Sequence, residues 1–253
     1  MRFASLASGS RGNATLVEGG GARILVDCGL PAREAERRLA QMGVAPRDLD
    51  AILVTHEHGD HVRGVATLSA RHGIEIWCTP GTWRRFGNGG DVRLRLLSGQ
   101  EAAVRIGDLR VRPYPLPHDA REPCQFVFEC AGRRFGMLTD AGRVTPHMRD
   151  MLGECDALLV ECNHDTEMLR DGPYPPPLQA RVGGAFGHLS NVQTADLVDS
   201  LPHPRLRHLV LAHISEKNNR PQLARGAMLQ VSLDLESRLV VAEQHCPTPW
   251  LAV

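Results

Sequence analysis

Short apolar runs separated by turn residues give this chain the pattern of a fold rich in β-strands. The apolar runs at 15–18 and 23–26 flank a glycine-rich turn, as expected for a hairpin. Pro31 suits the first turn of a helix and Gly43 suits its end, so we expect a helix between them. In this part of the chain the pattern predicts strands at 3–7, 15–18, 23–26, 51–54 and 74–78 and helices at 31–42 and 65–72.

The second half of the chain repeats this pattern. Residues 126–142 resemble 15–29, and both segments read as a hairpin that ends in Asp-x-Gly. Residues 156–164 likewise resemble 50–58, and a helix is expected before them at 144–152. Two repeats of hairpin, helix and strand predict two similar sheets packed together, with helices outside and a site at their shared edge.

The remaining segments carry weaker patterns. Residues 92–114 predict short antiparallel strands with turns at 98–99 and 107–108, and the proline-rich stretch 171–177 predicts loop or extended chain. Because no linker rich in Ser and Gly divides the sequence, we expect one domain over 1–253. We place its core at about 3–229, followed by a short C-terminal extension. The last predicted elements are a helix capped by Ser190 or Asn191 that runs to 200, a strand at 206–211 and a helix at 221–229.

Composition narrows the class of protein without identifying it. Basic and acidic residues balance at 29 each, so bulk charge favours neither nucleic acid nor membrane as a partner. Lys217 is the only lysine, so nearly all basic residues are arginines, whose guanidinium groups suit phosphate recognition. A compositional bias of the source is the favoured explanation of this excess of arginine over lysine.

The cysteines and the N-terminus bear on the compartment. Seven cysteines without a Cys-x-x-Cys pair predict neither a disulfide framework nor a thiolate metal site, and free thiols fit a reducing compartment. The N-terminus lacks the apolar region of a signal peptide, and no apolar run approaches ~20 residues. We therefore expect a cytoplasmic protein without a membrane partner.

The stretch 55–61, Thr-His-Glu-His-Gly-Asp-His, directly follows the strand predicted at 51–54. Imidazole and carboxylate are ligands for zinc, manganese and iron, and no thiol joins this cluster. The first two histidines alternate with Glu57, so both can face one ion while Glu57 points away. Asp60 and His61 come a turn later and can face a second ion. The alternative is a polar surface loop, which has no use for four ligands at this spacing.

Five apolar runs each end on a residue that can bind metal or move a proton: His56, His118, Asp140, Glu161 and His213. A single His or Asp after a strand is more often a turn residue. Strand ends of a sheet structure can converge on one edge, however, and five such ends predict a polar site there.

The pattern His-x-His-x-Asp-His, followed by a His, an Asp and a final His after later strands, resembles the metallo-β-lactamase superfamily. The similarity is closer still to its YycJ/WalJ-type branch, and it spans roughly residues 3–229. The stretches that resemble that branch are 6–14 (Leu-Ala-Ser-Gly-Ser-x-Gly-Asn-Ala), 161–165 (Glu-x-Asn-His-Asp), 187–191 (Gly-His-Leu-Ser-Asn) and 213–219 (His-Ile-Ser-Glu-x-Asn-Asn).

The resemblance implies an α/β fold, the four-layer αββα sandwich, with two divalent metal ions. Zinc or manganese is favoured, and iron is compatible with the same ligands. Two cations ~3.5–4 Å apart can polarise and clamp a phosphoryl or acyl group. Position by position, the resemblance assigns His56, His58 and His118 to one ion, Asp60, His61 and His213 to the other, and Asp140 to a bridge between them.

The candidate catalytic residues are Asp60, Glu161 and His188. In phosphodiesterase branches of the superfamily, a Glu and a His at matching places are implied to move protons at the leaving group. A Glu–His pair can raise the pKa of the histidine and hold its orientation, as a general acid requires. The His-Leu-Ser turn at 188–190 is similar to a motif of RNA-cleaving members, which favours phosphodiester substrates.

Other polar residues have weaker assignments. Asp27 is either an outer partner that orients a ligand histidine or a turn carboxylate. For His164, in the His58-equivalent place of the repeat, a structural role is favoured over catalysis. The turn at 10–13 and the pair 218–219 offer small polar groups that could hold a terminal phosphate. The histidines expected at the surface or in packing are His72, His147, His203, His208 and His245.

The resemblance implies a metal-dependent nuclease with nucleic acid as its partner, DNA favoured, acting as an exonuclease in the 5′ to 3′ direction. One alternative is a small-molecule hydrolase, such as a cyclic-nucleotide phosphodiesterase or a glyoxalase-like thioesterase. Another is a non-enzymatic, metal-dependent regulatory or binding protein. No large inserted domain is present of the kind that builds an extended RNA channel.

Overall fold

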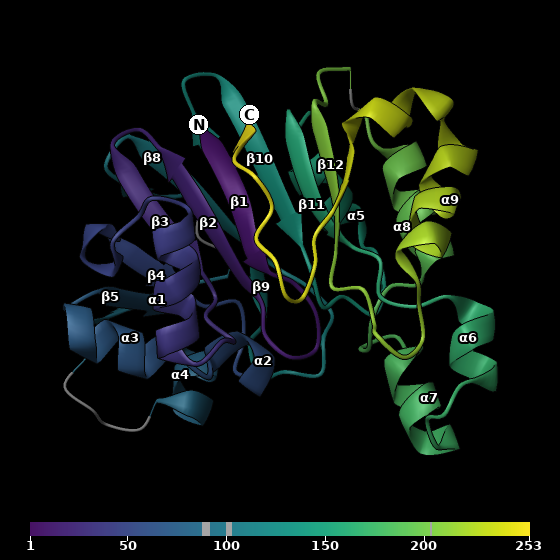
Figure 1. Ribbon diagram of the computed structural model, residues 1–253, viewed down its shortest axis with the longest axis horizontal. Helices are drawn as coiled ribbons and strands as arrows, with labels where there is room; N and C mark the ends of the chain where they lie inside the picture. Colours follow the sequence, from purple (N-terminus) through teal and green to yellow (C-terminus); the bar gives the residue numbers. More distant parts are fainter. Residues whose placement is uncertain (88–91, 100–102, 203) are drawn as a thin grey trace.

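The computed structural model of the chain describes residues 1–87, 92–99, 103–202 and 204–253. Within these ranges two seven-stranded sheets pack face to face, and helices cover both outer faces (Figure 1). This is the αββα sandwich that the repeat and the family resemblance predicted. His203, which was expected at the surface or in packing, lies outside the described residues.

The first sheet has an antiparallel and a parallel half. Its strands, in sheet order, are β14 (Leu251–Ala252), β1 (Arg2–Ala7), β2 (Ala14–Gly19), β3 (Ala22–Val26), β4 (Ala51–Leu53), β5 (Glu75–Cys78) and β6 (Leu94–Leu96). Pairing is antiparallel from β14 to β3 and parallel from β3 to β6.

The second sheet is built in the same way. Its strands, in sheet order, are β13 (Leu239–Val241), β12 (His208–Ala212), β11 (Ala157–Glu161), β10 (Arg133–Leu138), β9 (Cys124–Cys130), β8 (Leu109–Pro115) and β7 (Val104–Ile106). Pairing is antiparallel from β7 to β10 and parallel from β10 to β13.

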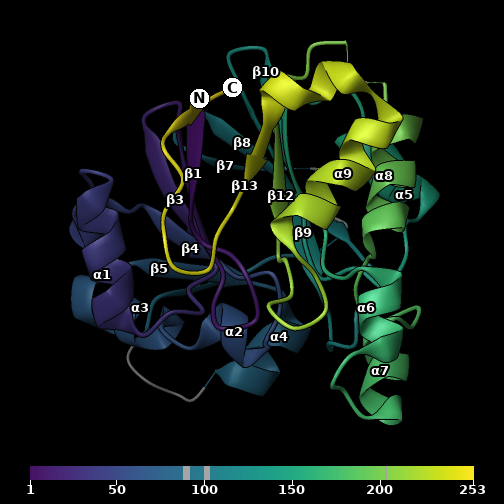
Figure 2. The ribbon, with the colours of Figure 1, turned by 45° about the vertical axis from the view of Figure 1, so that its right-hand side comes forward.

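Helices separate into those that cover the sheets and those at the strand ends. The helices are α1 (Ala32–Gln41), α2 (Gly59–Val62), α3 (Val65–His72), α4 (Pro80–Phe86), α5 (Pro146–Leu152), α6 (Thr166–Asp171), α7 (Pro176–Val182), α8 (Asn191–Ser200) and α9 (Pro221–Val231). Figure 2 shows α8 and α9 together beside the second sheet, while α6 and α7 project beyond its strand ends. None of the described helices has the length and apolar content needed to cross a bilayer.

Apolar side chains fill the space between the layers. Between the sheets, Phe3 stacks on Phe135 with ring centroids 3.9 Å apart, in one cluster with Phe126 and Phe128. Two further clusters lie under the helices on either side. Burial of one such side chain is worth about 1.5–3 kcal/mol, so the sheets are held firmly against each other. The edge where their strands end is therefore a rigid platform.

The internal repeat is confirmed by the strand pairing. In the first unit β2 and β3 form an antiparallel hairpin, α1 follows, and β4 then pairs parallel with β3. In the second unit β9 and β10 form the hairpin, α5 follows, and β11 pairs parallel with β10. Asp27 and Asp140 therefore take equivalent places, each just after the second strand of a hairpin.

Residues 92–114 do not form the predicted series of antiparallel strands. β6 pairs parallel with β5 in the first sheet, whereas β7 pairs with β8 in the second. The chain thus changes sheets after β6. Gly99 lies in a turn, as predicted, but that turn does not join two antiparallel strands. The turn at 107–108 is confirmed. A crossover and a hairpin can begin with the same turn residues, so the local sequence does not separate them.

The proline-rich stretch 171–177 is only partly irregular. Residue 171 ends α6, and Pro176 and Pro177 begin α7, so the prediction of loop or extended chain is wrong at both ends. Proline is compatible with the first positions of a helix because the missing N–H would have no partner there. The correction matters because α7 forms one wall of the site described below.

The C-terminal part of the chain contributes to both sheets. β13 pairs parallel with β12 at one edge, and β14 pairs antiparallel with β1 at the edge of the other sheet. The two ends of the chain lie side by side as a result (Figures 1 and 2). Residues after 229, expected as a short extension, thus supply an edge strand to each sheet.

Candidate metal and proton-transfer site

Three strand ends turn their last polar side chain in the same unusual way. Asp27 after β3, Asp140 after β10 and His213 after β12 have φ angles of 59°, 61° and 52°. Asp and His enter this left-handed region more readily than most residues other than glycine, but it still costs free energy. The strand ends therefore converge as predicted. The surrounding structure must stabilise the positive φ angles at these three residues.

Three histidines form the first group of potential ligands. His58 Nδ1 lies 3.1 Å from His56 Nε2 and 3.2 Å from His118 Nε2. In a tetrahedral site with zinc–nitrogen bonds of about 2.0–2.1 Å, ligand nitrogens lie roughly 3.3 Å apart. The three ring nitrogens therefore have the spacing that one cation would require.

The second group combines carboxylates and imidazoles. Asp60 Oδ2 lies 3.6 Å from His61 Nε2 and 3.5 Å from His213 Nε2, and His61 Nε2 lies 3.2 Å from Asp140 Oδ2. Asp140 Oδ2 and His213 Nε2 are buried without a hydrogen-bond partner. Buried polar atoms in native structures normally have a partner, so a cation fits this set of donors.

The outward ring nitrogens of these histidines are held by other groups. His61 Nδ1 donates to Asp27 Oδ2 at 2.8 Å, and His118 Nδ1 donates to the Gly187 carbonyl at 3.2 Å. His56 Nδ1 lies 3.0 Å from the hydroxyl of Thr55, which itself donates to Asp27. These contacts fix the tautomer that leaves the inward nitrogen free. Of the two roles open to Asp27, the geometry supports that of an outer partner.

Charges within the cluster balance one another. Burial lowers the pKa of His61, but Asp140 and Asp27 outweigh burial and hold it well above its usual range. Burial likewise lowers the pKa of His213, but Asp140 and Asp60 raise it to about 10. Burial raises the pKa of Asp60, but His61 and His213 bring it down to about 2. A cation that binds here would take the place of the imidazolium protons.

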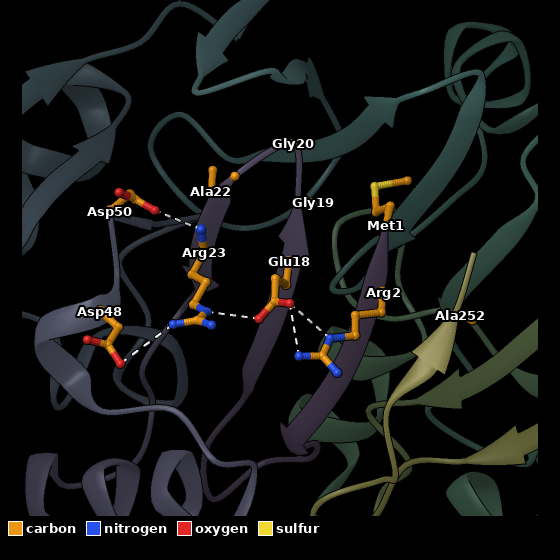
Figure 3. Close-up of a pocket in the computed structure, with 11 residues that line it drawn as sticks. Met1, Arg2, Glu18, Gly19, Gly20, Ala22, Arg23, Asp48, Asp50 and Ala252 are labelled. Atoms are coloured by element: carbon orange, nitrogen blue, oxygen red, sulfur yellow. Dashed lines mark hydrogen bonds and ion pairs between the residues drawn. The ribbon is translucent and has the colours of Figure 1, made fainter.

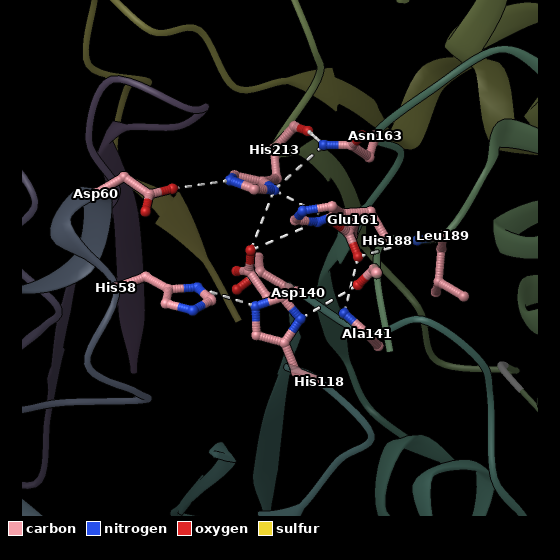
Figure 4. Close-up of polar contacts among 12 residues, drawn as sticks. His58, Asp60, His118, Asp140, Ala141, Glu161, Asn163, His188, Leu189 and His213 are labelled. Carbon is pink, nitrogen blue, oxygen red and sulfur yellow. Dashed lines mark hydrogen bonds and ion pairs between the residues drawn. The ribbon is translucent and has the colours of Figure 1, made fainter. Parts of the chain in front are cut away.

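Glu161 and His188 form a close pair beside this cluster. His188 Nδ1 donates to Glu161 Oε1 at 2.7 Å, and the backbone N–H groups of Ala141 and Leu189 donate to Oε2 (Figure 4). Burial raises the pKa of Glu161, but His188 brings it down to about 2. Burial lowers the pKa of His188, but Glu161 outweighs burial and raises it. With Nδ1 held, Nε2 is the atom of His188 left to exchange a proton in the pocket.

Members of both ligand groups and His188 line one pocket of about 420 Å³. His118, Asp140 and His213 line it from strand ends, Asp60 from α2 and His188 from the loop before α8. Tyr174, Leu178 and Arg181 line it from the α7 region. The pocket thus combines candidate metal ligands with a helical wall.

An ion pair that sequence reasoning missed connects this wall to the metal ligands. Arg181 Nε lies 2.5 Å from Asp119 Oδ2, and Asp119 Oδ1 lies 3.5 Å from His118 Nε2. Asp119 directly follows His118, which was an available signal. Arg181 lies in a helix that the proline-rich pattern concealed.

Two further residues hold the loop that carries His213 and were also missed. Ser8 Oγ accepts from the His213 backbone N–H at 2.7 Å, and Asn163 Nδ2 donates to the His213 carbonyl at 3.0 Å. Both lie in stretches that resemble the family, but their residue types alone do not reveal this role. They keep the unusual backbone of His213 in place.

The polar pair at 218–219 does not face the pocket. Asn218 is fully buried, and Asn219 Nδ2 donates to Asn191 Oδ1 and to the Cys162 carbonyl, both at 2.8 Å. The expectation that this pair holds a terminal phosphate is therefore wrong, because local polarity does not indicate burial. From the turn at 10–13, Ser10 lines the pocket.

Asn13, in the same turn, is buried against the metal-ligand motif. Its Nδ2 lies 3.1 Å from His61 Nε2, and its Oδ1 accepts from the backbone N–H of Gly9. It therefore braces the ligand His61 and the turn itself, so within this turn the side chain of Asn13 is engaged in these contacts.

The histidines outside the proposed sets lie apart from the pocket, although Nδ1 of His164 is buried without a hydrogen-bond partner. His164 is buried and forms a bridge with Ser190, away from the pocket, which supports the structural role favoured for it. His72 pairs with Glu36 at 2.8 Å, and His147 and His245 are exposed.

A larger hollow of about 660 Å³ lies at the opposite end of β1, β2 and β3 (Figure 3). Glu18 sits between Arg2 and Arg23 there, and Arg23 also approaches Asp48. Since these charges neutralise one another, this hollow lacks the free donors found at the strand ends.

Known proteins resemble this chain in sequence and in fold. A family model described as the beta-lactamase superfamily domain matches residues 22–214. An exodeoxyribonuclease WalJ from Streptococcus pneumoniae is 34% identical over 234 residues, which cover 90% of this chain and 87% of that protein. An exodeoxyribonuclease YycJ from Bacillus anthracis is 33% identical over 235 residues, which cover 91% and 89%.

A solved structure agrees in fold. The metallo-beta-lactamase fold protein YhfI from Bacillus subtilis matches with a TM-score of 0.72 and 14% sequence identity, over 98% of this chain and 99% of that one. At this identity the match supports the architecture and carries no information on substrate.

Proposed function

Since this chain belongs to the metallo-β-lactamase superfamily, in its YycJ/WalJ branch, we propose that it is a metal-dependent phosphodiester hydrolase that degrades DNA from an end. The observation that carries the proposal is the Glu161–His188 pair, 2.7 Å apart and beside the cluster of metal ligands. DNA is favoured because two relatives that align with about nine tenths of the chain are named exodeoxyribonucleases. The 5′ to 3′ direction follows from the family resemblance.

Each group of ligands has a proposed ion. His56, His58 and His118 would hold one divalent cation, Asp60, His61 and His213 the second, and Asp140 would lie between them. Zinc or manganese suits these imidazole and carboxylate ligands, and iron is compatible. Bound there, the pair of ions would supply an activated water and neutralise charge on a phosphoryl group.

The chain's own residues would manage the protons. His188, held by Glu161, is oriented to give a proton from Nε2 to the departing oxygen. Glu161 stays ionised because its pKa is about 2, so it supports the protonated form of His188. Asp60 lines the pocket and is also ionised, which makes it a candidate to orient the attacking water.

The test of this function uses purified protein supplied with Mn²⁺ or Zn²⁺. Linear duplex DNA labelled at either end should release mononucleotides, while a closed circle should remain intact. RNA and cyclic nucleotides serve as competing substrates. Rapid nicking of the circle would make the protein an endonuclease, and turnover of cyclic nucleotides without any polymer would assign it to the small-molecule hydrolases.

A second expected result concerns the number of ions. Protein reconstituted with metal should contain about two equivalents by elemental analysis. His118→Ala should weaken one site and spare the other, because His118 belongs to the three-histidine group alone. His147→Ala, at an exposed histidine outside the pocket, is the matched control. A stoichiometry that stays at one or zero under reconstitution contradicts a dinuclear site.

A further inference from the structure

Among the Phe, Tyr and Trp side chains in the described part of the chain, Phe186 is the one that is largely exposed. It is 56% exposed, whereas the phenylalanines of the inter-sheet core, Phe3, Phe126, Phe128 and Phe135, are fully buried. A single exposed apolar residue is not unusual in itself. Its position and its surroundings distinguish this one.

Phe186 directly precedes Gly187 and His188, which both line the pocket. Its carbonyl accepts from the backbone N–H of Asp119 at 3.0 Å. Gly142 packs so closely that a Cβ there would lie 2.4 Å from the backbone nitrogen of Phe186. The backbone of Phe186 is thus fixed between the loop that follows Asp140 and the loop that follows His118, while its ring is left in solvent.

A cation accompanies the ring. The guanidinium carbon of Arg143 lies 5.9 Å from the centroid of the Phe186 ring. Arg143 is itself exposed and follows Asp140 by three residues. Proteins that bind single-stranded nucleic acids without sequence preference use aromatic side chains for base stacking, with arginines beside them.

We infer that Phe186, supported by Arg143, stacks on a base of one of the two nucleotides joined by the cleaved phosphate. This rests on the proposed function and adds to it the contact that holds the end of the strand. A phenylalanine ring carries no hydrogen-bonding group, so it accepts any of the four bases. Such a contact suits an enzyme that removes nucleotides one after another, because the identity of the base changes at every step.

The test compares Phe186→Ala with wild type on two kinds of strand. One strand carries normal bases, and the other carries an abasic site on either side of the cleaved bond in turn. Phe186→Ala should raise KM on the normal strand by roughly 5- to 100-fold, the usual worth of one stacked base. On the strand whose abasic site removes the stacked base, wild type and variant should be alike. Phe186→Trp should restore the low KM on the normal strand.

Two controls separate stacking from stability and from the proposed function. Leu233→Ala removes a different exposed apolar side chain, which is 77% exposed and does not line the pocket. This variant should leave KM unchanged. Phe186→Leu keeps an apolar side chain for folding and should still show the loss. If Phe186→Ala has the wild-type KM on the normal strand, the inference is overturned while cleavage of DNA stands. If wild type cleaves no DNA, the proposed function itself fails.

Discussion

Replacing His188 by alanine is expected to lower kcat on DNA by roughly 10²–10⁴-fold, the usual worth of one acid–base group, with both metal ions retained. The reason is geometric. Nδ1 of His188 is held by Glu161, and His188 groups with Asp140, Glu161 and His213 and not with the two sets assigned to the ions. Rates and elemental analysis on the same preparation check both halves of this expectation. Loss of metal in the variant would mean that His188 is a ligand.

The size of the loss should depend on the leaving group. A nitrophenyl phosphodiester releases an anion that needs little protonation, so the ratio of wild-type to variant rates should shrink on that substrate. A role of His188 that is only structural would lower both rates by the same factor. His147→Ala, at an exposed histidine, supplies the baseline.

The same pair makes a prediction about pH. A general acid works while it is protonated, so the rate should fall as pH rises through the pKa of His188. Burial lowers that pKa and Glu161 raises it, with a net rise. Glu161→Gln removes the raising charge, so the alkaline fall should move to lower pH. An alkaline limb that does not move would disconnect Glu161 from this proton.

The sequence was informative about the site because the ligands sit at strand ends. A run of apolar residues followed by a His or a carboxylate is a local signal. The internal repeat gives the same signal twice, at Asp27 and at Asp140. The αββα arrangement followed from the same repeat, because two hairpins with a helix and a parallel strand can bury their apolar faces against each other. In the structure, β4 pairs parallel with β3 and β11 pairs parallel with β10, so the strand pairing agrees with the predicted repeat.

What the sequence concealed is non-local. Asp119 and Arg181 meet across 62 positions, and their contact depends on a helix that begins with prolines. Asn219 is polar yet buried, because the groups that accept from its side chain, Asn191 Oδ1 and the Cys162 carbonyl, lie far from it in the sequence. The crossover after β6 could not be told from a hairpin, because only the partner strand differs. In each case the deciding interaction joins segments far apart in the chain.

Asp27→Asn and Asp140→Asn are expected to differ sharply, although the repeat makes the two positions equivalent. Both residues have positive φ angles that asparagine tolerates, so the backbone should be retained. Asp140→Asn removes the carboxylate shared between the proposed ions and should abolish binding of both. Asp27→Asn should weaken metal binding by roughly 10- to 100-fold, as expected for an outer partner of a ligand histidine.

The effect at Asp27 follows from proton placement. The Asp27 carboxylate accepts from Thr55 and from His61 Nδ1, so His61 keeps its Nδ1 proton when a cation takes the place of the proton on Nε2. An amide nitrogen in place of Oδ2 cannot accept from Nδ1–H, and it favours the tautomer that carries its proton on Nε2. Once the cation has taken the place of the Nε2 proton, Nδ1–H of His61 would have no acceptor in the variant, so metal should bind more weakly.

Metal affinities measured with a competing chelator decide between the two roles first considered for Asp27. Asp156→Asn is the matched control, because Asp156 is also buried and hydrogen-bonded but stands at the start of β11, the far end from the site. Its variant should keep the wild-type affinity even if it melts at a lower temperature. If Asp27→Asn binds metal as tightly as that control, Asp27 is only a turn carboxylate, and the tautomer of His61 is set by something other than this contact.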